Sequence, residues 1–232
     1  MLNMAPFNPS RRRGLCQAVA LLTAALTSSG QAWANKASVT PVNPWPKGAS
    51  YTIGGRFKGF GYKAQGQLDW HMDADRYELR LLYKMPLVGQ RTQVSQGVLT
   101  TAGLQPQRYE ELERRNGLWI LDANQALQDK LSVLLQLAWL QQSGLAQPHP
   151  GQTVRLQVGK RADTWLFECL GPQTVSTELG SMATVSWLRK APTEDDTQVQ
   201  VWYAPSQGHW PVRMRLQQGT ADVVDQTLQA WL

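Results

Sequence analysis

Apolar and polar residues alternate along most of the chain that follows Tyr51. Between Ala64 and Asp73, apolar or small side chains take every second position, and Gln, Asp and His take the others. A period of two gives a strand one buried and one solvated face, as in antiparallel sheets. Similar segments, separated by turn residues, follow at 77–83, 92–98, 118–120, 154–158, 199–203 and 212–216. About a dozen such strands predict a mainly β protein, a single antiparallel curved sheet (half-barrel or barrel), with a sandwich as the alternative.

The segment 129–143 departs from this alternation. Its apolar residues recur at intervals of three and four, at Leu131, Leu134, Leu135 and Ala138, and Gly144 follows as a stop. This spacing predicts one mid-chain amphipathic helix of about four turns, with Asp129 placed favourably near its positive end. We expect its leucine stripe to pack on the sheet or across the mouth of the sheet.

The first 34 residues have the features of a secretory signal peptide. They contain no acidic residue, and Arg11, Arg12 and Arg13 precede a short apolar run over 15–26. The small residues Ala32 and Ala34 around Trp33 match a cleavage site, so we expect cleavage after Ala34 and a periplasmic location. The apolar run is shorter than the roughly 20 residues of a spanning helix, so an uncleaved anchor is the weaker alternative and we expect no membrane span after cleavage. The three arginines fit either Sec or twin-arginine export.

Removal of this segment changes what composition implies. The chain falls from 232 to 198 residues, and because three arginines leave without an acid, the net charge falls from +6 to +3. A charge of +3 without a run of Lys or Arg does not indicate a nucleic-acid surface. Only Cys169 remains, which excludes an intrachain disulfide and suggests a buried small hydrophobe. Residues 35–50, with three prolines, are expected to form an extended leader before a β-rich domain over 51–232.

The sequence contains no recognised catalytic or cofactor-binding motif, and we expect no catalytic residue, metal or cofactor. His71 between Asp69 and Asp73 could coordinate a cation, but three residues on the polar face of one strand more often form a solvated surface. The carboxylates Glu110, Glu111 and Glu113 fit charge pairing better than the paired acids of a glycosidase. The sequence leaves the question of enzymatic activity open and favours a non-enzyme.

Tryptophan is the most informative residue type. Nine of the ten tryptophans follow Ala34. Trp suits both a protein core and the wall of a cavity that binds lipid or sugar. Trp70, Trp165 and Trp187 lie in alternating segments, which favours the core. The alternative is that these three residues line an apolar ligand-binding cavity under a curved sheet.

Several local patterns resemble one known family. They are Ser95-x-Gly97, Gly103-Leu104-x-Pro106 with Tyr109, Asp129-Lys130-Leu131-Ser132, Pro150-Gly151, Glu178-x-x-Gly180, and Val201-Trp202-Tyr203 through Pro211-Val212. In this order they resemble the bacterial exported family known as domain of unknown function 3108, over roughly 51–232. The resemblance implies a periplasmic β-rich protein without an assigned reaction. By looser analogy, its architecture is similar to the half-barrels of periplasmic lipid and lipoprotein carriers.

Three hypotheses follow. The first is a non-enzymatic periplasmic protein that binds an apolar ligand or lipid in a β half-barrel. The second is an interaction or assembly factor of the cell envelope, which docks on an envelope protein through a sheet edge or the leader. The third and weakest is a glycan-active enzyme. An apolar cavity in the structure would favour the first hypothesis, and a completely filled interior would favour the second.

Overall fold

The structure is a computed structural model that describes residues 44–57, 59–85, 89–113, 117–122, 125–193, 196–219 and 222–232. The chain divides into two units, 1–36 and 37–232, and every described residue belongs to the second. The expected signal peptide and its cleavage site lie outside the described residues, as does most of the expected leader. Among the described residues, no helix has the length and apolar character needed to cross a membrane.

Strands make up most of the described chain. They are β1 (Gly48–Phe57), β2 (Phe60–Asp73), β3 (Arg76–Met85), β4 (Gly89–Thr100), β5 (Gly103–Glu111), β6 (Leu118–Ile120), β7 (Leu127–Gln128), β8 (Thr153–Val158), β9 (Asp163–Thr177), β10 (Gly180–Arg189), β11 (Thr197–Ala204), β12 (Trp210–Gln218) and β13 (Asp222–Trp231). The described residues also form one α-helix, α1 (Ser132–Gln142), and one short 3-10 helix, η1 (Pro205–Gln207).

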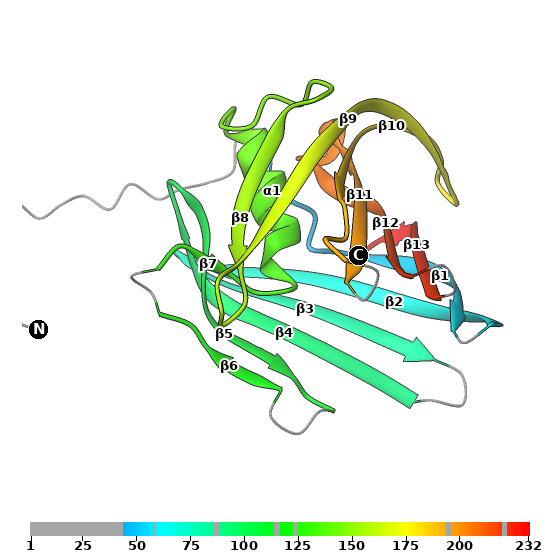
Figure 1. Cartoon of the computed structure of the whole chain (residues 1–232), viewed down its shortest axis with the longest axis horizontal. Coiled ribbons are helices and arrows are strands. Elements are labelled where there is room, and N and C mark those ends of the chain that lie inside the picture. The colour runs from blue at the N-terminus through cyan, green and yellow to red at the C-terminus, as the bar shows by residue number, and fades with distance from the viewer. Residues whose placement is uncertain are drawn as a thin grey trace, which may run out of the picture. The chain divides into compact units, whose positions relative to one another are not determined.

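All of these strands belong to one sheet. Its order is β6-β5-β4-β3-β2-β1-β13-β12-β11-β10-β9-β8-β7, and the neighbours pair antiparallel except for the short parallel pair β7 and β8. The first strand therefore lies in the middle of the sheet, between β2 and the last strand β13. Strands β1 to β6 extend to one side and β13 to β8 to the other (Figure 1). The prediction of a single curved, mainly antiparallel sheet with one helix is confirmed.

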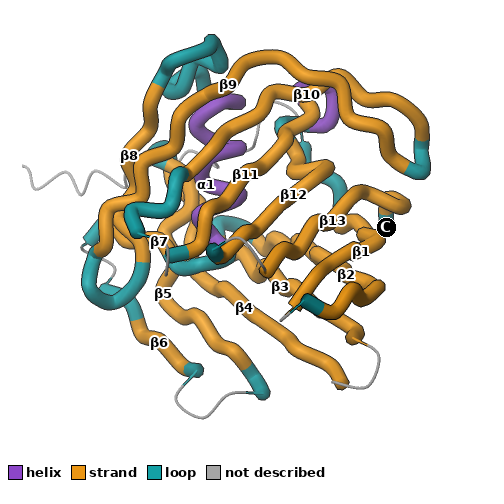
Figure 2. The backbone as a smooth tube through the Cα atoms, turned by 45° about the vertical axis from the view of Figure 1, so that its right-hand side comes forward, coloured by secondary structure: helices purple, strands orange, loops and turns teal. Residues whose placement is uncertain are grey.

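The sheet curves until its two edges approach each other (Figure 2). No backbone ladder joins the edges along the described residues; side chains link them instead. The amide of Gln128 in β7 donates to the carbonyl oxygen of Leu104 in β5 over 2.8 Å. Lys160, in the turn after β8, donates to the carbonyl oxygen of Leu118 in β6 over 3.1 Å. The result is an open sheet with the curvature of a half-barrel that is nearly closed at one point.

Helix α1 lies inside this curve and not on its rim (Figures 1 and 2). Every residue from Leu131 to Trp139 is buried, so the helix is enclosed on all sides and has no solvated polar face. Gln136 and Gln141 are buried, and Gln136 pairs with the strands: it accepts from the backbone N–H of Leu104 over 2.7 Å and donates to the carbonyl of Ala102 over 2.9 Å. The predicted helix is therefore present, but its polar positions fasten it to strands instead of meeting water.

A buried carboxylate organises the start of α1. Asp129 accepts hydrogen bonds from the backbone N–H groups of Leu131 and Ser132 over 2.8 and 2.7 Å. It also accepts from the hydroxyl of Ser95 in β4 over 2.6 Å. The carboxylate thus satisfies free N–H groups of the first turn, as expected from its place in the sequence, and ties that turn to the sheet.

An aromatic cluster fills one end of the curved sheet. Trp45 packs edge-on against Trp70, with 4.8 Å between the ring centroids, and Trp70 stacks on Tyr77 at 5.4 Å. The indole N–H of Trp45 donates to the carbonyl of Gly208 over 2.7 Å. Trp45 and the first residues of β1 lie within the stretch expected as an extended leader. The folded domain therefore begins several residues before Tyr51, because Trp45 contributes to the core.

Cys169 is buried in β9 and is the one free cysteine of the described residues. Burial raises the pKa of its thiol. Both observations agree with the prediction of a small buried hydrophobe.

Candidate ligand cavity

The other end of the curved sheet contains a cavity of about 940 Å³. Its apolar wall is formed by Ile53, Leu81, Val199, Met214, Leu216 and Val224 from the strands, with Leu131 and Leu134 from the start of α1. The helix therefore divides the interior, with a filled aromatic core behind it and an apolar cavity in front of it. The sequence left open whether the interior holds a cavity or is completely filled. The structure shows a filled core at one end of the sheet and a cavity at the other.

Strand register explains why these side chains meet. Residues directly opposite in an antiparallel ladder point to the same face of the sheet. Ile53 in β1 is opposite Gln226 in β13, and Gln226 is opposite Met214 in β12. One row of the cavity wall therefore comes from strands at the two ends of the sequence. No local pattern could have assigned these three residues to one site.

A buried arginine is the main polar feature of the wall. Arg189 ends β10, only 6% of its surface is exposed, and its guanidinium lies over the Trp165 ring at 4.3 Å from the centroid. It donates one hydrogen bond to the carbonyl of Thr197. No described carboxylate lies within 4.0 Å of it.

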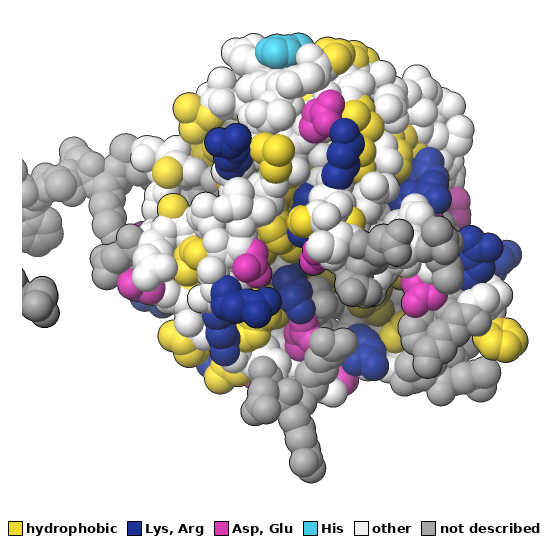
Figure 3. Space-filling model, in the orientation of Figure 1, with side chains coloured by type: hydrophobic (Ala, Val, Ile, Leu, Met, Phe, Trp, Pro, Cys, Tyr) yellow, Lys and Arg dark blue, Asp and Glu magenta, His cyan; other side chains and the backbone are white. Residues whose placement is uncertain are grey.

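Two carboxylates also line the cavity, but other groups engage them. Asp163 pairs with Arg161 at 3.9 Å, and Asp196 accepts from the hydroxyl of Thr193 over 2.9 Å. Burial lowers the pKa of the Arg189 guanidinium, and the charges of Asp196 and Asp163 oppose that shift. Figure 3 shows Lys and Arg side chains, with Asp and Glu between them, around the middle of the face drawn there. Charged groups of both signs therefore accompany the apolar wall, and cations exceed carboxylates among its lining residues.

A second polar feature lies in β13, three strands away from Arg189. Gln226 is only 1% exposed, and its amide donates to the hydroxyl of Tyr83 over 3.1 Å. Burial raises the pKa of Tyr83 to about 12, so this phenol is neutral near pH 7. The Oε1 atom of Gln226 has no hydrogen-bond partner among the described residues, which leaves an acceptor on the cavity wall.

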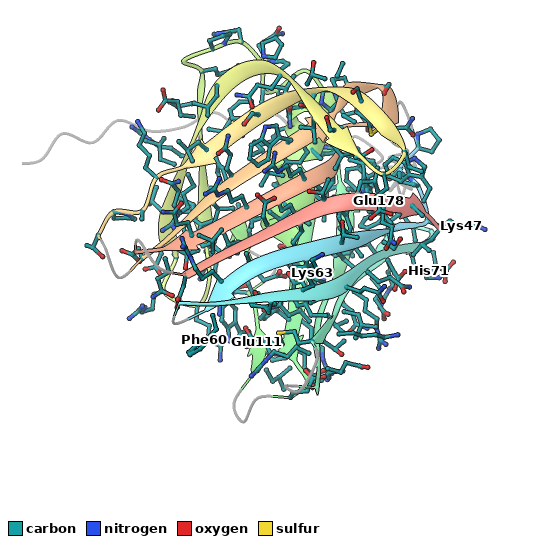
Figure 4. The ribbon with its side chains drawn as sticks, turned by 90° about the vertical axis from the view of Figure 1, so that its right-hand side faces the viewer. Lys47, Phe60, Lys63, His71, Glu111 and Glu178 are labelled. Atoms are coloured by element: carbon teal, nitrogen blue, oxygen red, sulfur yellow. The ribbon has the colours of Figure 1, made fainter. Side chains whose placement is uncertain are left out.

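The mouth of the cavity lies at the turn between β1 and β2. A second hollow of about 730 Å³ shares Tyr62, Met85 and Leu216 with the cavity and extends to Phe60. Phe60 is 80% exposed. Figure 4 shows it at the end of the sheet away from Lys47 and His71. The cavity is therefore open at the end of the domain opposite the aromatic core.

The structure places the three predicted tryptophans in different surroundings. Trp165 lines the cavity. Trp70 belongs to the aromatic cluster, and Trp187 is fully buried and donates to the side chain of Gln141 in α1 over 3.0 Å. These two residues belong to the core, which the alternation had favoured, and the three rings do not form one site.

Sequence reasoning missed Arg189 and Gln226. Each lies two residues from an inward-facing apolar residue of its strand, and so faces the same side of the sheet: Arg189 follows Trp187, and Gln226 precedes Leu228. A polar residue within an inward apolar row was the available signal. To use this signal, one must know where each strand begins and ends, and the alternation alone did not locate the strand ends accurately enough.

The other candidate residues lie outside the cavity wall. His71 and Asp73 are exposed, and the described residues contain no cluster of three His, Cys, Asp or Glu side chains suited to a metal. Glu110 pairs with Arg108 at 2.9 Å, and Glu111 pairs with Lys130 at 3.2 Å. These glutamates therefore act as charge partners.

Comparison with known proteins finds structural neighbours but no family. No protein-family model matches the chain, and no curated protein is similar enough to count as a relative. A solved structure, the beta-barrel-like protein of domain of unknown function DUF1849 from Brucella abortus, aligns over 82% of this chain and 97% of that chain. The sequence identity is 10% and the TM-score is 0.45. The resemblance to domain of unknown function 3108 remains a prediction.

Proposed function

We propose that this protein is a non-enzymatic periplasmic protein that binds an apolar ligand, such as a lipid, in the cavity between the sheet and α1. The observation that carries the proposal is the apolar cavity itself, whose volume of about 940 Å³ lies near the upper end of the range typical of ligand sites. A core formed only for stability would be filled, because interiors pack with few voids larger than water.

The floor of the cavity is held in place before any ligand binds. Leu134 faces the cavity, and its carbonyl accepts from the buried hydroxyl of Tyr203 over 2.9 Å. The hydrogen bonds of Gln136 to the β4–β5 turn hold the next turn of the helix. A floor fixed in this way resists collapse into the empty space, which favours binding by reducing the ordering cost.

The location and family membership are further parts of the proposal. Export to the periplasm, with cleavage after Ala34, is supported by the basic, apolar and small-residue segments at the N-terminus. Membership in domain of unknown function 3108 is supported by the motifs around Ser95 and Asp129, which form one structural unit in this fold. Docking on an envelope protein remains the alternative prediction.

Binding of an uncharged fluorescent probe, N-phenyl-1-naphthylamine, tests the proposed function. We expect its emission to rise and shift to the blue with the wild-type domain. Leu216→Trp enlarges a side chain on the cavity wall and should weaken binding by about tenfold, equivalent to about 1.4 kcal/mol. The matched control is Arg215→Trp on the next residue of β12, outside the cavity wall, which should leave affinity unchanged.

Two outcomes would contradict the proposed function. Absence of probe binding to a folded wild-type domain is the first. Equal weakening by Leu216→Trp and Arg215→Trp is the second, because it would place the bound probe on the outer surface. Thermal unfolding of each variant establishes that both remain folded.

A further inference from the structure

We propose that the ligand is a single-chain amphiphile with an anionic head group, and that Arg189 is the counter-ion of that group. This inference rests on the proposed function and specifies its ligand class. The cavity supplies an apolar wall for a hydrocarbon chain. Arg189 supplies a positive charge on that wall, and the described residues accept only one hydrogen bond from the N–H groups of its guanidinium.

The register of the strands places this charge near the mouth. Arg189 is opposite Val199 in β11, two residues from the start of that strand at Thr197. Val199 is opposite Leu216, which also lines the outer hollow. Leu131, which precedes α1, and Leu134 within it lie on the inner side. An amphiphile would therefore insert its chain toward α1 and leave its charged head at the mouth.

The surroundings of Arg189 suit an incoming anion. A guanidinium has five N–H donors, and the described residues accept one hydrogen bond from this one. Stacking on Trp165 fixes its plane, which lowers the entropy lost when two further donors engage a carboxylate or phosphate. The partly buried position also strengthens the attraction, because screening by water is reduced.

A second stacked arginine shows how a guanidinium with an acidic partner differs from Arg189. Arg213 provides the comparison: it lies over Trp202 at 4.8 Å, but it also forms a two-bond ion pair with Asp225, at 2.9 and 2.7 Å. Arg213 is absent from the cavity wall. Both arginines therefore stack on a tryptophan ring. Arg213 is paired with a carboxylate outside the cavity, whereas Arg189 faces the cavity and has no described carboxylate bonded to its guanidinium.

Displacement of N-phenyl-1-naphthylamine by C12 compounds with different head groups tests the inference. Laurate and dodecyl phosphate carry an anion, and dodecanol has the same chain without charge. We expect the wild-type domain to bind the two anions at least about tenfold more tightly than dodecanol, the usual size of a charge-assisted hydrogen bond in a partly buried site. Comparison of the two anions shows which head group fits better.

Variants assign the preference to one residue. Arg189→Gln should remove the preference for the anions by weakening laurate and dodecyl phosphate binding about tenfold relative to dodecanol, whereas Arg189→Lys should retain most of the preference. Arg213→Gln, the matched control, should behave as the wild type. If Arg189→Gln does not fold, Arg189→Met, which removes the charge but keeps the apolar stem, replaces it, and the wild-type ratio still tests the preference for anions.

These experiments distinguish failure of the inference about the ligand's head group from failure of the proposed function. Equal binding of laurate and dodecanol by the wild type, or a preference that survives Arg189→Gln, would overturn the inference while leaving the proposed function standing. Displacement of the probe by acetate or inorganic phosphate at the same concentrations would indicate a free-anion site and would also overturn it. If neither dodecanol nor the probe binds, the proposed function itself fails.

Discussion

Asp129 shows how one buried residue supports the candidate site without touching it. Its carboxylate joins the first turn of α1 to Ser95, and the hydroxyl of Ser95 also lies 3.1 Å from that of Tyr77. Burial raises the pKa of Asp129, and the hydrogen bonds from Ser95, Ser132 and Leu131 oppose that shift. The residue holds the helical floor of the cavity, and its hydrogen-bond partners among the described residues are uncharged.

The raised pKa predicts the direction of a pH effect. The folded state holds the proton of Asp129 at higher pH than the unfolded chain, whose Asp pKa is about 3.9. The stabilising contribution is therefore complete below that pH and is lost as the pH rises through the folded-state pKa. The free energy of unfolding of the wild type, measured relative to Asp129→Asn, should fall over that interval and stay constant above it. Urea unfolding at several pH values gives the comparison, and a flat or rising difference would contradict it.

At the scale of elements, helix α1 is held against the turn that precedes β5. Gly103 has a φ of +107°, and a Cβ added there would lie 2.2 Å from the side-chain oxygen of Gln136. The close approach lets Gln136 hydrogen-bond both Leu104 and Ala102. The turn and the helix thus fix each other, and through them the position of the cavity floor.

Two glycines in similar turns make this contact measurable. Gly180 has a φ of +104° but open space where its Cβ would be. In both turns the threonine three residues earlier donates to the carbonyl of the glycine, over 3.0 and 2.8 Å. Gly103→Ala and Gly180→Ala therefore carry the same backbone strain.

Gly103→Ala should lower the free energy of unfolding, measured with urea, by about 1–3 kcal/mol more than Gly180→Ala does, because it also displaces the buried hydrogen-bonded amide of Gln136. Equal losses would show that Gln136 does not hold the turn.

At the scale of the whole molecule, the central pairing of β1 with β13 holds the two halves of the sheet together. The first half of the sheet extends from β1 and the second from β13. The backbone N–H of Leu232 donates to the carbonyl of Gly48 over 3.0 Å, so the two ends of the folded domain lie side by side. The cavity spans this junction, because Ile53 and Gln226 come from its two strands.

Proline substitutions compare the centre of the sheet with its edge. Thr227 in β13 pairs with Thr52 on one side and Arg213 on the other, whereas Ile120 lies in the edge strand β6 and is 69% exposed. Thr227→Pro should destabilise the domain by about 3 kcal/mol or more, because proline removes a ladder hydrogen bond. Ile120→Pro should cost clearly less, about 1 kcal/mol or under. Similar losses in urea unfolding would indicate that β6 is as important to the sheet as β13.

The sequence alone determined the class of this protein. Strict alternation and glycine turns specify antiparallel strands, because side chains on a strand point to opposite faces. The apolar spacing over 129–143 specifies the helix, and Asp129 its start. The position of Trp70 and Trp187 in the core also agrees with their alternating segments.

Only the tertiary structure decided where the helix lies and which residues share a cavity. The apolar spacing predicted an amphipathic helix, yet Gln136 finds buried partners in the turn at Gly103, and that contact joins residues 32 positions apart. Ile53 and Leu81 line the same cavity as Gln226 and Arg189 because β13 returns to pair with β1. Periodicity reports which side of a strand a residue faces, but strand order and curvature decide what it faces across the interior.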